Sequence, residues 1–134
     1  MLLRLEEIQE ARKPLFQIGD FTLHSGEKSN WKVECDVLTK EDWECLAAMI
    51  AERCQFKDVI GIPEGGLNLR DYLSLSCTKD DSLPTLIVDD VLTTGNSMEE
   101  ARSHIKGEVI GHVVFARGKC PEWIKALWQL DAHA

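Results

Sequence analysis

The sequence has no long hydrophobic run. No segment approaches the ~18 consecutive apolar residues from which a membrane-spanning helix is built. The stretch from Met1 to Glu7 already carries charges and lacks the apolar centre of a signal peptide. We therefore expect a protein that works in the cytoplasm and has no membrane partner.

Closely paired cysteines are also absent. The five cysteines are odd in number and widely spaced, and none forms a Cys-x-x-Cys pair: Cys35, Cys45, Cys54, Cys77 and Cys120. This spacing indicates neither a structural zinc site nor a disulfide framework. We expect reduced thiols, as is usual in cytosolic proteins, and no metal site built by the protein's own side chains.

Basic residues are too few for a nucleic-acid-binding surface. Lysine and arginine total 15 against 23 acidic residues, which gives a net charge of −8. Affinity for nucleic acid comes mainly from lysine and arginine side chains on phosphates, so a nucleic-acid partner is not expected. An anionic ligand would have to be bound by backbone N–H groups and a metal ion at its site, because the sequence predicts no large surface rich in lysine and arginine to attract it.

The sequence does contain an alternation of helix and strand patterns. Its 134 residues suit one domain spanning 1–134. Short apolar runs predict buried strands at 58–62, 86–91 and 108–115. Apolar residues at helical spacing predict helices at 2–12, 43–54, 67–73, 98–105 and 123–128. This alternation predicts an α/β fold with a mostly parallel sheet flanked by helices.

Two local patterns extend this expectation. Residues 16–36 alternate between apolar and polar on both sides of Ser25-Gly26, which predicts an N-terminal hairpin of two strands with a polar connection. The segment 67–73 is weaker and could be a turn. The residues Leu73, Leu75 and Cys77 alternate after it, so an edge strand at this position remains open.

The stretch 85–98 has the strongest functional signal. Apolar residues bracket Asp89 and Asp90, and the loop 93–97 of small polar residues precedes a helix-like run. Ligands of open α/β sheets bind beyond the carboxyl ends of the strands, which places both acids at a strand tip. The free N–H groups and dipole of the following helix favour a phosphate. The carboxylates should face hydroxyls or a divalent cation. A sugar phosphate meets both requirements, because its phosphate suits the helix N-terminus and its hydroxyls suit the carboxylates.

This stretch resembles the phosphoribosyl-pyrophosphate signature of the type I phosphoribosyltransferases. The resemblance implies that Asp89 and Asp90 are the catalytic pair and hold the ribose hydroxyls. It also implies that the loop binds the 5-phosphate, through Thr93, Thr94, Gly95, Asn96 and Ser97.

A second turn, Ile62 to Gly66, follows the strand predicted at 58–62. Its paired glycines allow the backbone to approach a ligand closely. The turn is similar to the loop that binds the pyrophosphate half of the substrate in the same family. This implies substrate-binding roles for Pro63, Glu64, Gly65 and Gly66. The cofactor implied is Mg²⁺, held mainly through the substrate and lying between Glu64 and the pyrophosphate.

The segment 19–29 is similar to the N-terminal segment that contacts the base in orotate phosphoribosyltransferases. It implies a base pocket formed by Phe21, His24, Ser25 and Ser29, with His24 where the family pattern has a lysine. Taken together, the resemblance implies phosphoribosyl transfer from phosphoribosyl pyrophosphate to a nucleobase, an orotate-like pyrimidine, with release of pyrophosphate. It further implies a role in pyrimidine biosynthesis and a homodimer.

Two alternatives remain. Only residues 67–88 separate the glycine turn from the acidic pair, and Arg70 and Lys79 are their sole cations, so the long catalytic flap of the orotate enzymes is missing. A non-catalytic regulatory module that binds phosphoribosyl pyrophosphate or a nucleotide is therefore the alternative function. A receiver domain also has paired acids at a strand end. In receivers, however, the pair follows the first strand, whereas Asp89 lies two-thirds along this chain.

Overall fold

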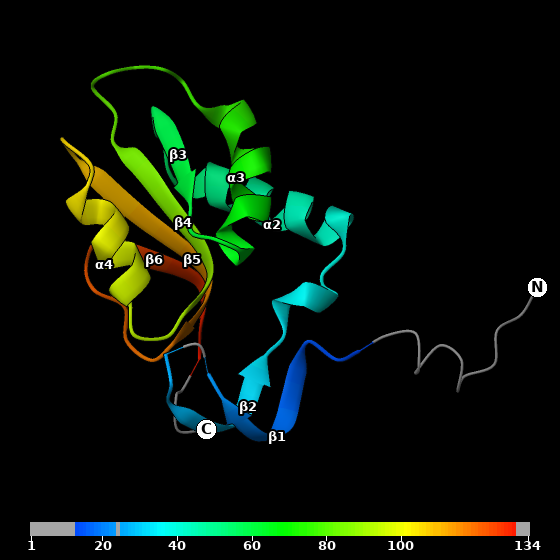
Figure 1. The fold of residues 1–134 in the computed structure, drawn as a ribbon. Helices are drawn as coiled ribbons and strands as arrows, with labels where there is room; N and C mark the ends of the chain where they lie inside the picture. Colours follow the sequence, from blue (N-terminus) through cyan, green and yellow to red (C-terminus); the bar gives the residue numbers. More distant parts are fainter. Residues whose placement is uncertain (1–12, 24, 131–134) are drawn as a thin grey trace, which may run out of the picture. The chain divides into compact units, whose positions relative to one another are not determined.

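The computed structural model describes residues 13–23 and 25–130 and divides the chain into two compact units (Figure 1). The first unit is Met1–Thr39 and the second is Lys40–Ala134. The helix predicted at 2–12 and the site residue His24 lie outside the described residues. The expectation of a single domain over 1–134 stays a prediction.

The first unit contains the predicted hairpin. Strands β1 (Phe16–Thr22) and β2 (Lys28–Val33) pair in antiparallel fashion, and the 3₁₀ helix η1 (Cys35–Val37) follows. The turn is closed by the N–H of Leu23, which donates to the carbonyl of Glu27 at 2.9 Å. Gly26 lies in this turn with φ 89°, in the left-handed region that glycine adopts without strain.

The second unit is built on a four-stranded parallel sheet, which confirms the predicted fold class. Its strands are β3 (Asp58–Gly61), β4 (Thr85–Leu92), β5 (Val109–Arg117) and β6 (Ile124–Leu130), in the order β3-β4-β5-β6. The strand β4 is an inner strand, and its first four residues are buried because both faces of the sheet are covered.

The helix predicted at 123–128 is wrong, because this segment forms β6. It pairs with β5 from Gly111 opposite Ile124 to Arg117 opposite Leu130. A short apolar run fits a buried helix and a strand equally well, and the unpaired edge of β5 decides between them. The rings of Trp128 and Phe115 stack across the two strands with centroids 5.5 Å apart.

The edge strand considered near Leu75 is also absent from the described residues. Helix α3 (Gly65–Leu73) is followed directly by the 3₁₀ helix η2 (Ser74–Ser76). The side chain of Leu75 is 84% exposed, so the alternation of apolar residues here does not reflect a buried strand face.

Helices α2 (Lys40–Arg53) and α4 (Asn96–Ser103) complete the second unit. The periodicity predicted for α2 is confirmed, because its apolar stripe is the buried face: Trp43, Leu46, Ala47 and Ile50. In the described part of the chain, no helix is both long and apolar enough to cross a bilayer.

Helices α3 and α4 cover opposite faces of the sheet (Figure 1). A side chain at Gly61 would meet α3 at Arg70, whereas one at Gly111 would meet α4 at Met98. The two crossover connections are β3-α3-β4 and β4-α4-β5, and both step in the same direction across the sheet. Because their helices lie on opposite faces, the two connections have opposite hands. One of them is therefore left-handed, although such connections are right-handed in about 98% of cases. As a result, two helix N-termini flank the carboxyl end of β4 from opposite faces.

Candidate functional site

The acidic pair lies near the carboxyl end of β4. The strand continues to Leu92, two residues beyond the predicted tip, because Asp89 and Val91 pair with β5 opposite Val113 and Phe115. Both acids are half-buried. They therefore belong to the regular sheet rather than to the loop, which limits the directions that their carboxylates can take.

The two carboxyl groups bind neighbouring backbone N–H groups. Oδ1 of Asp89 accepts from the N–H of Asp90 at 2.8 Å, and Oδ1 of Asp90 accepts from the N–H of Val91 at 2.7 Å. Burial, a side-chain hydrogen bond with Asp90 and the like charge of that group together raise the pKa of Asp89 to about 8, although the hydrogen bond from the N–H of Asp90 acts to lower it. Near neutral pH, Asp89 is therefore largely protonated. The pair can then both donate to and accept from a ligand hydroxyl.

The predicted phosphate loop is shorter than expected. Helix α4 begins at Asn96, so Asn96 and Ser97 form its first turn, and the loop itself is Thr93, Thr94 and Gly95. Gly95 is the N-cap residue with φ 83°, and its carbonyl accepts the N–H of Glu99 at 3.0 Å. Thr94 Oγ1 accepts the N–H of Asn96 at 3.3 Å.

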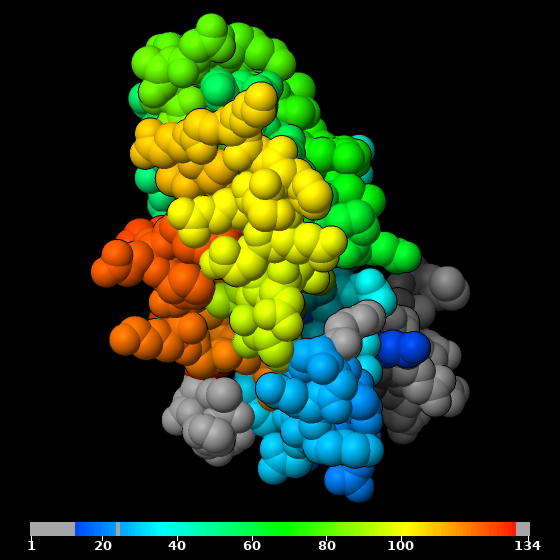
Figure 2. Space-filling model, turned by 60° about the vertical axis from the view of Figure 1, so that its left-hand side comes forward, coloured from blue at the N-terminus to red at the C-terminus, as the bar shows by residue number. Residues whose placement is uncertain are grey.

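This helix N-terminus is exposed. Thr94, Asn96 and Ser97 are accessible to solvent, and the yellow surface of α4 lies open in Figure 2. The N-cap position carries a glycine, which has no side chain to accept the N–H groups of the first turn. An anion at this position would meet those N–H groups and the positive end of the helix dipole.

The glycine turn lies directly against β4. The N–H of Ile62 donates to the carbonyl of Val88 at 2.9 Å, and the N–H of Gly66 donates to the carbonyl of Ile62 at 2.8 Å. Pro63 and Glu64 are exposed, and the peptide bond between them is cis. The structure therefore brings the two predicted elements, the turn 62–66 and the acidic pair, to the same edge of the sheet.

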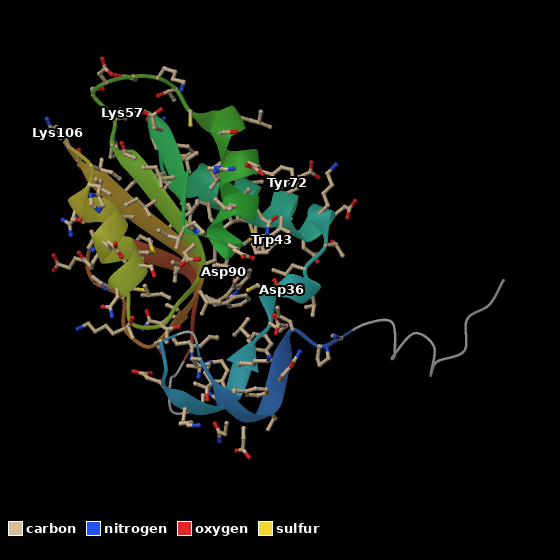
Figure 3. All side chains as sticks on the ribbon, in the orientation of Figure 1. Asp36, Trp43, Lys57, Tyr72, Asp90 and Lys106 are labelled. Carbon is tan, nitrogen blue, oxygen red and sulfur yellow. The ribbon has the colours of Figure 1, made fainter. Side chains whose placement is uncertain are left out.

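Gly65 of the turn lies against Asp90 of the acidic pair. The Cα of Gly65 lies so near the carboxylate of Asp90 that a Cβ there would overlap it. Figure 3 shows Asp90 beside the first turn of α3 and far from Lys57 and Lys106, which lie at the other end of the sheet.

The two cations of the 67–88 connection are engaged elsewhere. Arg70 pairs with Asp71 at 2.8 Å. Lys79 pairs at 3.4 Å with Asp58, the first residue of β3. This pair lies at the amino ends of the parallel strands, whereas the acidic pair lies near their carboxyl ends. Lys79 therefore lies away from the acidic pair.

Sequence reasoning missed one cation at the site edge. Arg117 is the last residue of β5, the neighbour of β4, and it is half-buried. Carboxyl ends of parallel strands meet at one edge, so Arg117 lies at the same edge as the acidic pair. Its position directly after the apolar run 113–116 was a signal that could have found it.

The predicted base-pocket residues belong to the first unit. The ammonium of Lys32 lies 4.8 Å from the ring centroid of Phe21 and pairs with Glu34 at 3.0 Å. Ser29 Oγ donates to the carbonyl of Trp31 at 2.7 Å, and Ser25 is exposed. The role of these residues toward a base stays a prediction.

This architecture, a parallel sheet flanked by helices with an N-terminal hairpin, defines a fold of the type I phosphoribosyltransferase class. No family model and no curated protein sequence matches the chain. Among solved structures, the orotate phosphoribosyltransferase of Aeropyrum pernix is similar, with a TM-score of 0.68, 22% identity and 94% of each chain covered.

Two further structures agree with this fold. The UMP synthase of Leishmania donovani has a TM-score of 0.69 at 19% identity, over 87% of this chain and 34% of that one. A phosphoribosyltransferase of Corynebacterium diphtheriae has a TM-score of 0.63 at 13% identity, over 76% and 84%. At these identities, the similarity establishes the fold.

Proposed function

We propose that the protein transfers a phosphoribosyl group from phosphoribosyl pyrophosphate to a nitrogen of a nucleobase, an orotate-like pyrimidine, and releases pyrophosphate. One observation carries this proposal. The glycine turn touches Asp90 of the acidic pair, and only three residues separate the end of the same strand, at Leu92, from helix α4, which begins at Asn96. In this proposal, the carboxyl end of the sheet holds the pyrophosphate, the ribose and the 5-phosphate in separate places.

In this proposal the chain acts mainly by positioning. Asp89 and Asp90 orient the ribose through its hydroxyls, so that the anomeric carbon faces the base. Residues 93–97, which form the loop and the first turn of α4, anchor the 5-phosphate, and residues 63–66 hold the pyrophosphate. Such positioning lowers the barrier because reactants in the correct geometry lose little further entropy on reaching the transition state.

Mg²⁺ would be held chiefly by the phosphate oxygens of the substrate. Among the described residues, no three His, Cys, Asp or Glu side chains come together as a metal-binding group. Glu64 is an exposed carboxylate in the turn, and carboxylate and phosphate oxygens are the ligands that this ion prefers. When bound, the ion would neutralise charge on the departing pyrophosphate.

We also propose a cytoplasmic homodimer. The net charge of −8 leaves few cations for an anionic substrate, and the two cations of residues 67–88 are paired with Asp71 and Asp58. A partner subunit could supply a cation that this connection lacks. The base would be selected by Phe21, His24, Ser25 and Ser29.

The proposal is tested by mixing the protein with phosphoribosyl pyrophosphate, Mg²⁺ and a panel of nucleobases, and measuring pyrophosphate release. We expect release that depends on one base and is lost in Asp90→Asn. Asp81→Asn is the matched control, because Asp81 is exposed in the turn before β4. No release and no binding of phosphoribosyl pyrophosphate would refute the proposal.

A regulatory module is the second candidate function. The connection 67–88 folds as α3, η2 and a short turn, and these described residues include no hairpin that could close over the site. A closing loop normally excludes water from such a reaction. Binding of phosphoribosyl pyrophosphate without release of pyrophosphate, for any base in the panel, would favour this function.

A further inference from the structure

Gly65 is a glycine for reasons of space. A Cβ at this position would lie 2.6 Å from Oδ1 of Asp90 and closer still to Cγ and Oδ2. The positive-φ glycines of the described chain are Gly26, Gly95, Gly107 and Gly118, so Gly65 needs no left-handed backbone. Gly95 is the opposite case, because its φ is 83° and a Cβ there would meet only Leu92 at 3.5 Å.

Neither partner of this contact can easily move away. The carboxylate of Asp90 accepts the N–H of Val91 at 2.7 Å, which fixes one of its oxygens. On the other side, the turn is fastened to β4 by the hydrogen bond from Ile62 to Val88 at 2.9 Å. Gly66 is also pressed against the carbonyl of Val88, since a Cβ there would overlap that oxygen.

We propose that Gly65 is a positioning residue that sets the orientation of the Asp90 carboxylate. This inference rests on the proposed function, in which Asp90 holds the ribose hydroxyls. The first residue of α3 then contacts the Asp90 carboxylate and limits its orientation. The turn 62–66 therefore affects the ribose site as well as the pyrophosphate site. Because Gly65 has no side chain, the turn can contact Asp90 directly, and this contact couples the proposed ribose and pyrophosphate sites.

The first test measures binding of ribose 5-phosphate to Gly65→Ala by calorimetry. This ligand has no pyrophosphate, so a loss of affinity cannot arise from contacts of the turn with a pyrophosphate. We expect affinity roughly 10–100-fold weaker than wild type, the loss expected when a hydrogen bond to a charged group is displaced. Gly107→Ala is the control for an added Cβ that strains the backbone without touching Asp90, because φ there is 91° and nothing lies within 4 Å of the added atom. It should bind ribose 5-phosphate as the wild type does.

The second test is a double-mutant cycle in thermal unfolding, which does not depend on any ligand. Gly65→Ala should lower the unfolding midpoint by several degrees in the wild-type background. In the Asp90→Ala background, the same change should lower it little, because the overlapping carboxylate is gone. If Gly65→Ala alone does not fold, the double variant should fold. Equal losses in both backgrounds, or a double variant that also fails to fold, would overturn the inference.

The two proposals fail in distinguishable ways. If the wild-type protein binds neither ribose 5-phosphate nor phosphoribosyl pyrophosphate, the proposed function is wrong and Gly65 has no ribose site to position. If the wild type binds and Gly65→Ala binds equally well, the function stands and the positioning role is wrong.

Discussion

Oδ1 of Asp89 accepts a hydrogen bond from the backbone N–H of Asp90 at 2.8 Å, which holds the side chain of one acid against the backbone of the next. Burial and the adjacent carboxyl group then place Asp89 in an environment that disfavours its charge, and its pKa rises to about 8. The acidic pair is therefore electrostatically costly in the fully ionised state. A carboxyl group with a strongly raised pKa, such as Asp89, is typical of functional sites.

The stability of the protein should fall as the pH rises through the titration of Asp89. Its folded-state pKa of about 8 exceeds the ordinary value of 3.8, so the folded state binds more protons between these values. The stabilisation is complete below pH 3.8 and is lost as the pH approaches about 8. Asp89→Asn should flatten this dependence in thermal unfolding measured across that range. Asp81→Asn, at an exposed turn, should leave the dependence unchanged.

Substitution of Gly95 should separate phosphate binding from folding. Gly95→Val places a β-branched residue at φ 83°, which such residues resist, and we expect the loss of more than ~100-fold in affinity for ribose 5-phosphate because the first turn of α4 must shift. Gly107→Val has the same backbone problem at φ 91° without adjoining the site. Equal affinities for the two variants by calorimetry would contradict the assignment of the phosphate loop.

His112 should make the protein sensitive to acid. Its side chain is 2% exposed, Nδ1 lies 3.0 Å from the carbonyl of Val113, and within the described residues Nε2 has no hydrogen-bond partner. Burial, with the charge of Arg53, lowers the pKa of His112 below 6.5. The unfolded state therefore gains the proton first, and stability is lost as the pH falls below 6.5.

His112→Leu should remove this acid-induced loss. The free energy of unfolding of the variant relative to wild type should increase as the pH is lowered from 6.5, measured in urea at a series of pH values. His104→Leu is the control, because His104 is exposed after α4. A constant difference between His112→Leu and wild type over this range would show that His112 does not titrate on unfolding.

Trp123 should hold α4 to the loop before β6. Its indole N–H donates to Oε1 of Glu99 at 2.7 Å, and the guanidinium of Arg102 lies 4.7 Å from its ring centroid. Trp123→Phe keeps an aromatic ring but removes the donor, so we expect a loss of roughly 0.5–1.5 kcal/mol in the free energy of unfolding. In a Glu99→Ala background, which removes the acceptor, the loss caused by Trp123→Phe should be smaller. If the loss is unchanged there, it arises from packing of the ring rather than from the hydrogen bond.

The sequence by itself determined the elements whose signal is local. The periodicity of α2 and the apolar runs of β3, β4 and β5 each follow from the burial of one helix stripe or of a whole strand, so residues close in sequence carry the pattern. That Asp89 and Asp90 lie near the carboxyl end of β4 was predictable for the same reason, although the strand continues two residues beyond them.

Only the tertiary structure decided the features that depend on a distant partner. Residues 124–130 became a strand because β5 offered an unpaired edge, although their sequence suits a helix as well. The contact of Gly65 with Asp90 joins two segments 25 positions apart, and only the packing of α3 against β4 brings them together. The pKa of Asp89 likewise depends on burial, which one sequence pattern cannot measure, because the free energy of a charge is set by everything that surrounds it.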